Sequence, residues 1–157
     1  DSAFHARVFG NQHYHLAASP AYLRQHGAPQ SPGDIQQHAC LVYKGSSGPN
    51  RWLLKQGEAP WVHYPLLPKL VSNNADALLS AALGGMGLVL FPDWLIGDCL
   101  KNGTLVKLLA GFDAAIHTET QQIAALYPNA RHPPLNVRAV IDYYVERFGT
   151  PPYWQVK

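Results

Sequence analysis

The stretch over residues 69–91 restricts the fold of this chain more than any other. It consists of an apolar run, two asparagines, a nine-residue segment rich in helix formers, three clustered glycines and a second apolar run: Lys69-Leu70-Val71-Ser72, Asn73-Asn74, Ala75 to Leu83, Gly84-Gly85-Met86-Gly87 and Leu88-Val89-Leu90-Phe91. Asparagine caps helix starts, and glycine ends helices because it adopts positive φ freely. The stretch therefore predicts strand 69–72, helix 75–83 and strand 88–91. Apolar residues all round the helix predict that it is fully buried.

Similar units precede and follow this stretch. Ser19-Pro20 predicts the start of a helix and Gly27 its end. Further helices are expected over 35–38, 93–100 and 136–148, and strands over 14–18, 39–43, 104–109 and 123–127, with a hairpin-like pair over 52–54 and 61–64. Short apolar strands that alternate with helices predict an α/β fold with a sheet covered on both faces.

Composition excludes several classes of protein. Of 157 residues, 47% are hydrophobic and 14% charged, and the net charge is only +2, which excludes a disordered chain. Lysine and arginine are dispersed, whereas a nucleic-acid surface needs them clustered. No apolar run reaches the roughly 20 residues of a membrane span, and Asp1 to Gly10 hold no signal core. We therefore expect a cytoplasmic protein without a membrane segment.

The chemistry of catalysis and metal binding is not visible in the sequence. It holds no G-x-S-x-G elbow, no phosphate loop and no local carboxylate pair. His13 and His15 would share one face of a strand, but a zinc site needs three or four ligands. Cys40 and Cys99 lie too far apart for a C-x-x-C motif. We expect no enzyme, no metal and no cofactor.

The junction Val71-Ser72-Asn73-Asn74-Ala75 is the most informative candidate for binding. In open α/β sheets, ligands bind beyond the carboxyl ends of strands, near helix N-termini. Free backbone N–H groups and side-chain amides there suit an anionic group such as a carboxylate. The competing interpretation is that an asparagine only caps the helix, and the sequence leaves both open.

Several segments, in this order, resemble LysR-type transcriptional regulators. They are Leu16-Ala17-Ala18-Ser19-Pro20-Ala21-Tyr22-Leu23, Ser72-Asn73-Asn74-Ala75-Asp76-Ala77-Leu78, Ala81 to Leu88, Phe91-Pro92-Asp93-Trp94-Leu95 and Arg131-His132-Pro133-Pro134. The resemblance is to the C-terminal effector-binding domain of that family and covers most of the chain. It implies two α/β lobes joined by two crossing strands, as in a periplasmic binding protein.

The resemblance also implies an organisation and partners. Residues 1–18 would be a partial first lobe with the first crossing near His15 to Ser19, and 19–88 a complete second lobe. Residues 89–157 would hold the second crossing, near Leu88 to Pro92, and the return to the first lobe. The family binds a small-molecule effector between the lobes, forms dimers or tetramers, and contacts DNA through an N-terminal helix-turn-helix that we expect to lie outside this chain.

Effector-binding residues follow from the same resemblance. Asn73 and Asn74 would make polar contacts, Tyr43 and Lys44 would lie at the carboxyl end of a strand, and Phe91 and Ser19 would line the hinge. Lys44 would favour an anionic effector, although its Gly/Ser-rich loop fits simple solvent exposure equally well. The alternatives are a solute-binding protein of the same fold and, with less support, an α/β enzyme.

Overall fold

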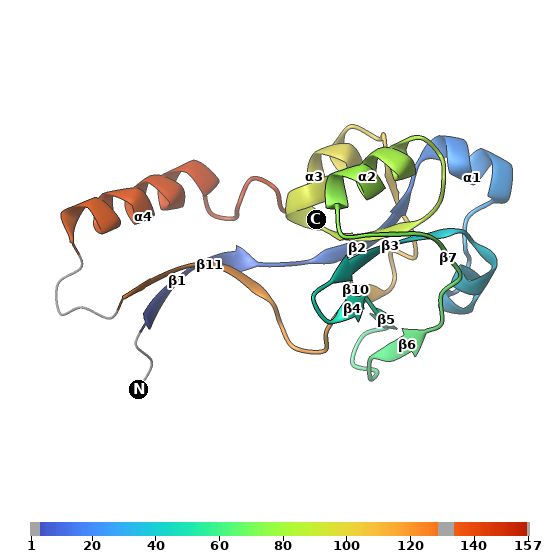
Figure 1. The fold of residues 1–157 in the computed structure, drawn as a ribbon, viewed down its shortest axis with the longest axis horizontal. Helices are drawn as coiled ribbons and strands as arrows, with labels where there is room; N and C mark the ends of the chain where they lie inside the picture. The colour runs from blue at the N-terminus through green and yellow to red at the C-terminus, as the bar shows by residue number, and fades with distance from the viewer. Residues whose placement is uncertain (1–3, 129–133, 157) are drawn as a thin grey trace.

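The computed structural model describes residues 4–128 and 134–156, so part of the Arg131 to Pro134 motif lies outside the described residues. Figure 1 shows a body of sheets and short helices and, beside it, an extended end. The strands of the chain are β1 (Phe4–Asn11), β2 (Tyr14–Ala18), β3 (Cys40–Gly45), β4 (Gly48–Pro49), β5 (Trp52–Lys55), β6 (Val62–Tyr64), β7 (Pro68–Ser72), β8 (Val89–Pro92), β9 (Val106–Lys107), β10 (Asp113–Ala115) and β11 (Gln122–Pro128). The helices are α1 (Pro20–His26), the 3-10 helix η1 (Pro32–Gln37), α2 (Ala75–Leu83), α3 (Asp93–Lys101) and α4 (Leu135–Phe148).

Two sheets form the body. One has the order β6-β5-β10-β2-β8, with β9 also paired to β2, and the other has the order β4-β3-β7. Strands β3 and β7 run parallel, and a parallel bridge between Cys40 and Leu88 joins β3 to the start of β8. The carboxyl ends of β3, β7 and β8 therefore lie at one edge. Strand β2 is antiparallel to β8, so its own carboxyl end lies at the opposite edge.

Alternate residues of β2 contribute to two hydrophobic clusters, as expected for a strand with both faces covered. Leu16 and Ala18 belong to a cluster with Tyr22, Ile35 and Trp52. Ala17 belongs to the second cluster, which contains buried residues of β8, α2 and α3: Val89, Phe91, Leu78, Ala82 and Ile96. Helices α2 and α3 thus cover one face of the body.

The extended end consists of β1, β11 and α4. Strands β1 and β11 form a two-stranded antiparallel sheet, from Phe4 opposite Pro128 to Asn11 opposite Gln122. Helix α4 packs against β1, and none of its residues is buried. This part of the chain has elements but no core of its own.

Most of the expected helices are confirmed. Helix α2 has the predicted bounds, with Asn74 as its N-cap, and Gly85 follows its end with φ of 81°. Its predicted complete burial is wrong: only Leu78 and Ala82 are buried and Leu83 is 39% exposed, because the helix packs through one face. The strand expected over 104–109 is reduced to Val106–Lys107, and β1, β4 and β10 were not anticipated.

The second crossing is the main correction to the expected organisation. After Pro92 the chain enters α3, whose Ile96 packs in the second cluster, and β9 and β10 then pair with β2 and β5. The chain leaves the body only at residues 116–121, between β10 and β11, rather than near Leu88 to Pro92. The first crossing is the short link between β1 and β2. The body therefore extends over 14–115, beyond the predicted boundary at residue 88.

Candidate functional site

Several of the predicted site residues meet where β3 and β7 end. Tyr43 and Ser72 are paired in register in the two parallel strands, so Lys44 and Asn73 follow at the same edge. Phe91 lies near the end of β8, the third strand that terminates here. We call this set of Tyr43, Lys44, Asn73, Asn74 and Phe91 the carboxyl edge.

The polar side chains of the carboxyl edge differ in whether they already form hydrogen bonds or ion pairs within the chain. Asn74 caps α2, because its Oδ1 accepts a hydrogen bond from Ala77 N at 3.0 Å, and its own N–H donates to Ser72 Oγ at 3.0 Å. Asn73 is exposed, and its side chain makes no hydrogen bond to the described residues. Lys44 is exposed opposite Pro49 in the β3–β4 hairpin, and no carboxylate of the described chain pairs with it. Asn73 and Lys44 therefore retain free polar groups.

The aromatic residues of the carboxyl edge belong to the core. Phe91 is buried in the second cluster, and the half-buried Tyr43 packs against that cluster. Ser19 is not brought to this edge. It is buried at the far end of β2, where its Oγ accepts a hydrogen bond from Tyr22 N at 3.3 Å and caps α1. The pairing of β2 with β8 is antiparallel, and this separates Ser19 from Phe91.

A cavity of about 630 Å³ lies on the other side of β2, between β2, β5, β10 and residues 116–121. None of the predicted site residues lines it. Its titratable lining residues are His13, Tyr14, His15, Lys55, Lys107, Asp113, His117 and Glu119. The spacing of His13 and His15 was the available sequence signal, but the other groups come from strands whose pairing the sequence does not reveal.

Two buried titratable side chains lack part of their hydrogen bonding. His15 is 6% exposed and its Nε2 has no partner; burial, followed by the nearby Lys107 and His13, lowers its pKa to about 4. Asp93 is fully buried at the start of α3. Its Oδ1 accepts a hydrogen bond from Trp94 N at 2.9 Å, its Oδ2 has no partner, and burial raises its pKa.

Gln12 connects the two crossings to the body. Its Nε2 donates to Tyr14 Oη at 2.7 Å and to Gln121 Oε1 at 3.2 Å, and its Oε1 accepts from Trp94 Nε1 at 3.0 Å. Its backbone N–H also donates to Gln121 O at 2.8 Å. No local motif marks this glutamine, because its partners are separated from it by up to 109 residues.

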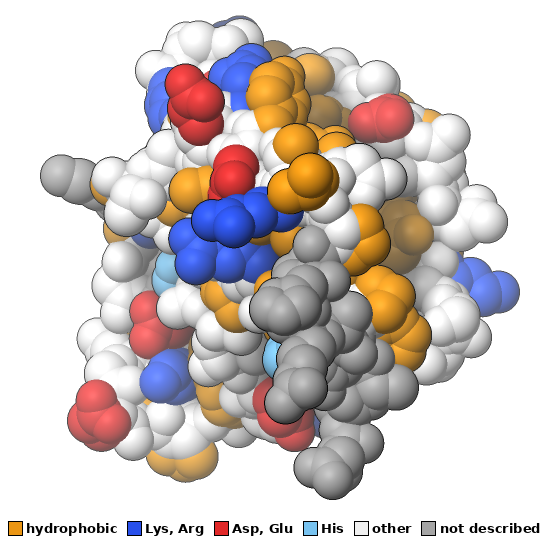
Figure 2. All heavy atoms as spheres, turned by 90° about the vertical axis from the view of Figure 1, so that its left-hand side faces the viewer, with side chains coloured by type: hydrophobic (Ala, Val, Ile, Leu, Met, Phe, Trp, Pro, Cys, Tyr) orange, Lys and Arg blue, Asp and Glu red, His pale blue; other side chains and the backbone are white. Residues whose placement is uncertain are grey.

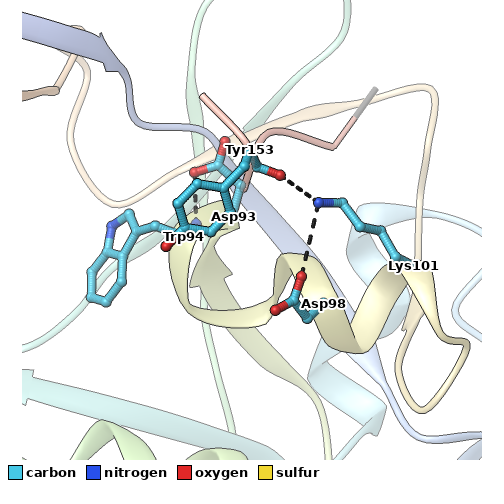
Figure 3. A network of polar contacts seen from close by, with 5 residues as sticks. All are labelled: Asp93, Trp94, Asp98, Lys101 and Tyr153. Carbon is cyan, nitrogen blue, oxygen red and sulfur yellow. Dashed lines mark hydrogen bonds and ion pairs between the residues drawn. The ribbon is translucent and has the colours of Figure 1, made fainter. Parts of the chain in front are cut away.

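The segment after α4, residues 149–156, lies on α3, and we call it the C-terminal tail. Figure 3 shows Lys101 between two oxygens: its Nζ donates to Tyr153 O at 2.6 Å and lies 3.9 Å from Asp98 Oδ1. The same tail approaches Gly97 so closely that a Cβ there would stand 2.5 Å from Trp154 O. The tail thus holds the extended end and the body together through α3.

The described residues contain neither a cluster of metal-binding side chains nor a helix that could cross a membrane. Within residues 4–128 and 134–156, no three His, Cys, Asp or Glu side chains are placed to hold a metal ion. Among the same residues, no helix combines the length and apolarity that a membrane crossing requires.

A body in which parallel strands end at one edge, linked by two crossings to a second part, has the arrangement of a two-lobed fold of the periplasmic-binding-protein type. The family model described as "LysR substrate binding domain" matches residues 1–149. The chain belongs to this family, and the resemblance seen in its sequence is confirmed.

Curated relatives are named as transcriptional regulators. The chain is 32% identical over 143 residues to an uncharacterized HTH-type transcriptional regulator of Haemophilus influenzae, covering 89% of this chain and 47% of that protein. It is 29% identical over 149 residues to the HTH-type transcriptional regulator CrgA of Neisseria meningitidis serogroup B, covering 95% of this chain and 48% of CrgA. The chain thus spans about half the length of the curated relatives it matches.

Solved structures show the same architecture. The CrgA regulatory domain of Neisseria meningitidis matches with a TM-score of 0.77 and 30% identity, over 95% of this chain and 71% of that chain. The AphB regulatory domain of Vibrio vulnificus matches with a TM-score of 0.76 and 29% identity, over 93% of this chain and 71% of that chain. The predicted fold class is confirmed.

Proposed function

We propose that the chain is the effector-sensing part of a cytoplasmic LysR-type transcriptional regulator and has no enzymatic role. A small anionic metabolite would bind at the carboxyl edge, between the body and the first lobe. The whole protein would act as a dimer or tetramer and contact DNA through an N-terminal helix-turn-helix. The observation that carries the proposal is the pair of unengaged polar side chains, Asn73 and Lys44, at the shared end of β3 and β7.

The chemistry of this edge favours a carboxylate. Lys44 supplies a cation without a partner among the described residues, and Asn73 supplies an amide that can donate. The first turn of α2 adds the partial positive charge of a helix N-terminus, although Asn74 already accepts the Ala77 N–H. Tyr43 provides an apolar wall beside these groups. Asn74 serves here as the helix cap that fixes the edge, and Asn73 as the residue that reaches the effector.

The test is a thermal-shift screen of the full-length protein against a panel of small mono- and dicarboxylates. A ligand that binds only the folded state raises its melting temperature. For any carboxylate that does so, Asn73→Ala and Lys44→Gln should each weaken binding about 10-fold or more, the usual loss for a hydrogen bond to a charged group.

Lys69→Gln is the matched control, because Lys69 is also exposed but lies near the start of β7, away from the carboxyl edge. Its binding should equal that of the unmodified protein. Equal binding by the Asn73 and Lys44 variants would contradict the proposed site.

A further inference from the structure

The extended end and the body are joined by two backbone crossings that lie side by side. The first crossing consists of residues 12–13, between β1 and β2, and the second of residues 116–121, between β10 and β11. Gln12 N donates to Gln121 O at 2.8 Å, so the pairing of β1 with β11 continues by one further bond into the crossings. We call the two crossings together the hinge.

The extended end has little else to fix its orientation. Among the described residues, none of those in β1, β11 and α4 is buried, and the two strands pair only with each other. The orientation of this end therefore depends on contacts at the hinge and on the C-terminal tail, where Lys101 Nζ donates to Tyr153 O at 2.6 Å.

The side chain of Gln12 connects the hinge to the body. Its Oε1 accepts a hydrogen bond from Trp94 Nε1 at 3.0 Å, at the start of α3, and its Nε2 donates to Tyr14 Oη at 2.7 Å, in β2. The same Nε2 donates to Gln121 Oε1 at 3.2 Å, in the second crossing. An indole nitrogen only donates, so Oε1 must face Trp94 and the two N–H groups must face Tyr14 and Gln121. One amide thus joins α3, β2 and both crossings.

The hydrogen bonds of Gln12 are accessible to water. Trp94 is 49% exposed, and Gln12, Tyr14 and Gln121 are all half-buried. A hydrogen bond at such a position exchanges with bonds to water at a small net cost, whereas a fully buried amide that lost its partners would be left unsatisfied. The contacts of Gln12 can therefore break and form again without unfolding of the body.

We propose that Gln12 is a positioning residue that fixes the orientation of the extended end relative to the body, and that the two parts turn about the hinge when its side-chain bonds break. Asp93 N donates to His13 O at 2.8 Å, which holds the first crossing on the body beyond Gln12, so the turning occurs at Gln12 itself. The C-terminal tail limits how far the two parts turn. The restraint acts in the chain without a ligand, so it can be tested independently of the proposed effector site.

Residual dipolar couplings of backbone amides report the relative orientation of the two parts in the full chain. All proteins compared carry Leu126→Lys, because Leu126 is 71% exposed on β11 and a charge there opposes association through this strand. With Gln12 present, one alignment tensor should fit the couplings of both parts. With Gln12→Leu, each part should retain its own internal fit while the shared fit is lost, and the indole N–H signal of Trp94 should shift. A loss of stability alone would leave the shared fit intact.

Gln122→Leu is the matched control. Gln122 directly follows the second crossing, and its Nε2 donates to Asn11 Oδ1 at 3.3 Å, so this bond lies within the extended end. One tensor should fit its couplings as before. Trp94→Phe removes only the bond between Gln12 and α3, and it should cause a smaller loss of the shared fit than Gln12→Leu.

Three results would overturn the restraint. They are a shared fit that Gln12→Leu retains, a loss of the shared fit that is as large in Gln122→Leu, and the absence of a shared fit when Gln12 is present. If Gln12→Leu does not fold, Trp94→Phe decides in its place, and an unchanged shared fit in that variant overturns the proposal.

Discussion

His15 makes the stability of the body depend on pH. Its pKa is about 4 in the folded chain and about 6.5 in an unfolded one, so between these values the unfolded state binds the proton more readily. Stability is therefore complete above pH 6.5 and is lost as the pH falls toward 4. From pH 7 to pH 5 the contribution of His15 should fall by about 2 kcal/mol.

Urea unfolding at pH 7 and pH 5 measures this loss. His15→Gln should lose about 2 kcal/mol less than the unmodified chain between the two pH values, whatever its stability at pH 7. His117→Gln is the control, because His117 is exposed and should leave the difference unchanged. A His15 variant with the same pH dependence as the unmodified chain would show that this imidazole does not stay neutral.

At the scale of the element, the contact between the tail and α3 depends on Gly97. A Cβ at this position would lie 2.5 Å from Trp154 O, and backbone on both sides limits how far the two can move apart. Gly97→Ala should therefore displace the tail and expose Trp154, at a cost of about 1–3 kcal/mol typical of overpacking. A red shift of tryptophan fluorescence and faster proteolysis of the tail would report the displacement.

Gly111→Ala provides the matched control for Gly97→Ala. A Cβ at Gly111 would meet no heavy atom within 4 Å, and the residue has no positive φ, so alanine there should be tolerated. If both variants keep the tail in place, the close approach at Gly97 does not fix it.

The elements that were predicted correctly begin or end at strong local sequence signals. Ser19-Pro20 and Asn74 place the starts of α1 and α2 because each capping side chain bonds within its own first turn. The strand-to-helix junction that contains Asn74 also placed Asn73 at the end of a strand. The predicted position of Tyr43 and Lys44 at the carboxyl end of a strand is confirmed, and the parallel pairing of β3 with β7 brings them to the edge where β7 ends; their role in effector binding stays a prediction.

Features that depend on distant pairing could not be predicted in this way. Strand β10 has three residues, and its place is set by β5 and β2 rather than by its own Asp113-Ala114-Ala115 sequence. The cavity exists because β9 and β10 pair with β2 at separate places, which no local pattern encodes. Ser19 was assigned to the hinge because it ends a crossing strand, but the direction of that strand carries it to the far edge.

At the scale of the whole molecule, the body and the extended end are stabilised unequally. The two hydrophobic clusters lie in the body, whereas the described residues of α4 are all at least partly exposed. An aromatic group joins α4 to β1 and the tail, with Phe148 in contact with Phe9, Tyr144 and Trp154. Figure 2 shows this end of the molecule, where hydrophobic side chains in orange stand at the surface. The exposed large hydrophobic residues of β1, β11 and α4 include Phe4, Val8, Leu126, Leu135, Val140 and Tyr143.

The exposed apolar end should make the isolated chain associate with itself. Among the described strands, β1 and β11 pair only with each other, so each presents an open edge there. Open edges beside apolar side chains favour pairing with another chain. Sedimentation of the 157-residue chain should show a mass that increases with concentration. Leu126→Lys should shift this association to about 10-fold higher concentration, since it places a charge on an apolar edge strand.

Leu67→Lys distinguishes association through the extended end from nonspecific association through any exposed apolar side chain. Leu67 is 66% exposed and Leu126 is 71% exposed, so the two substitutions remove similar apolar area and add the same charge. Leu67 precedes β7 in the body, however, away from the open edges of β1 and β11. Association that is reduced by Leu126→Lys and not by Leu67→Lys would locate it at the extended end. Equal effects, or a monomer at all concentrations, would show that this end does not drive association.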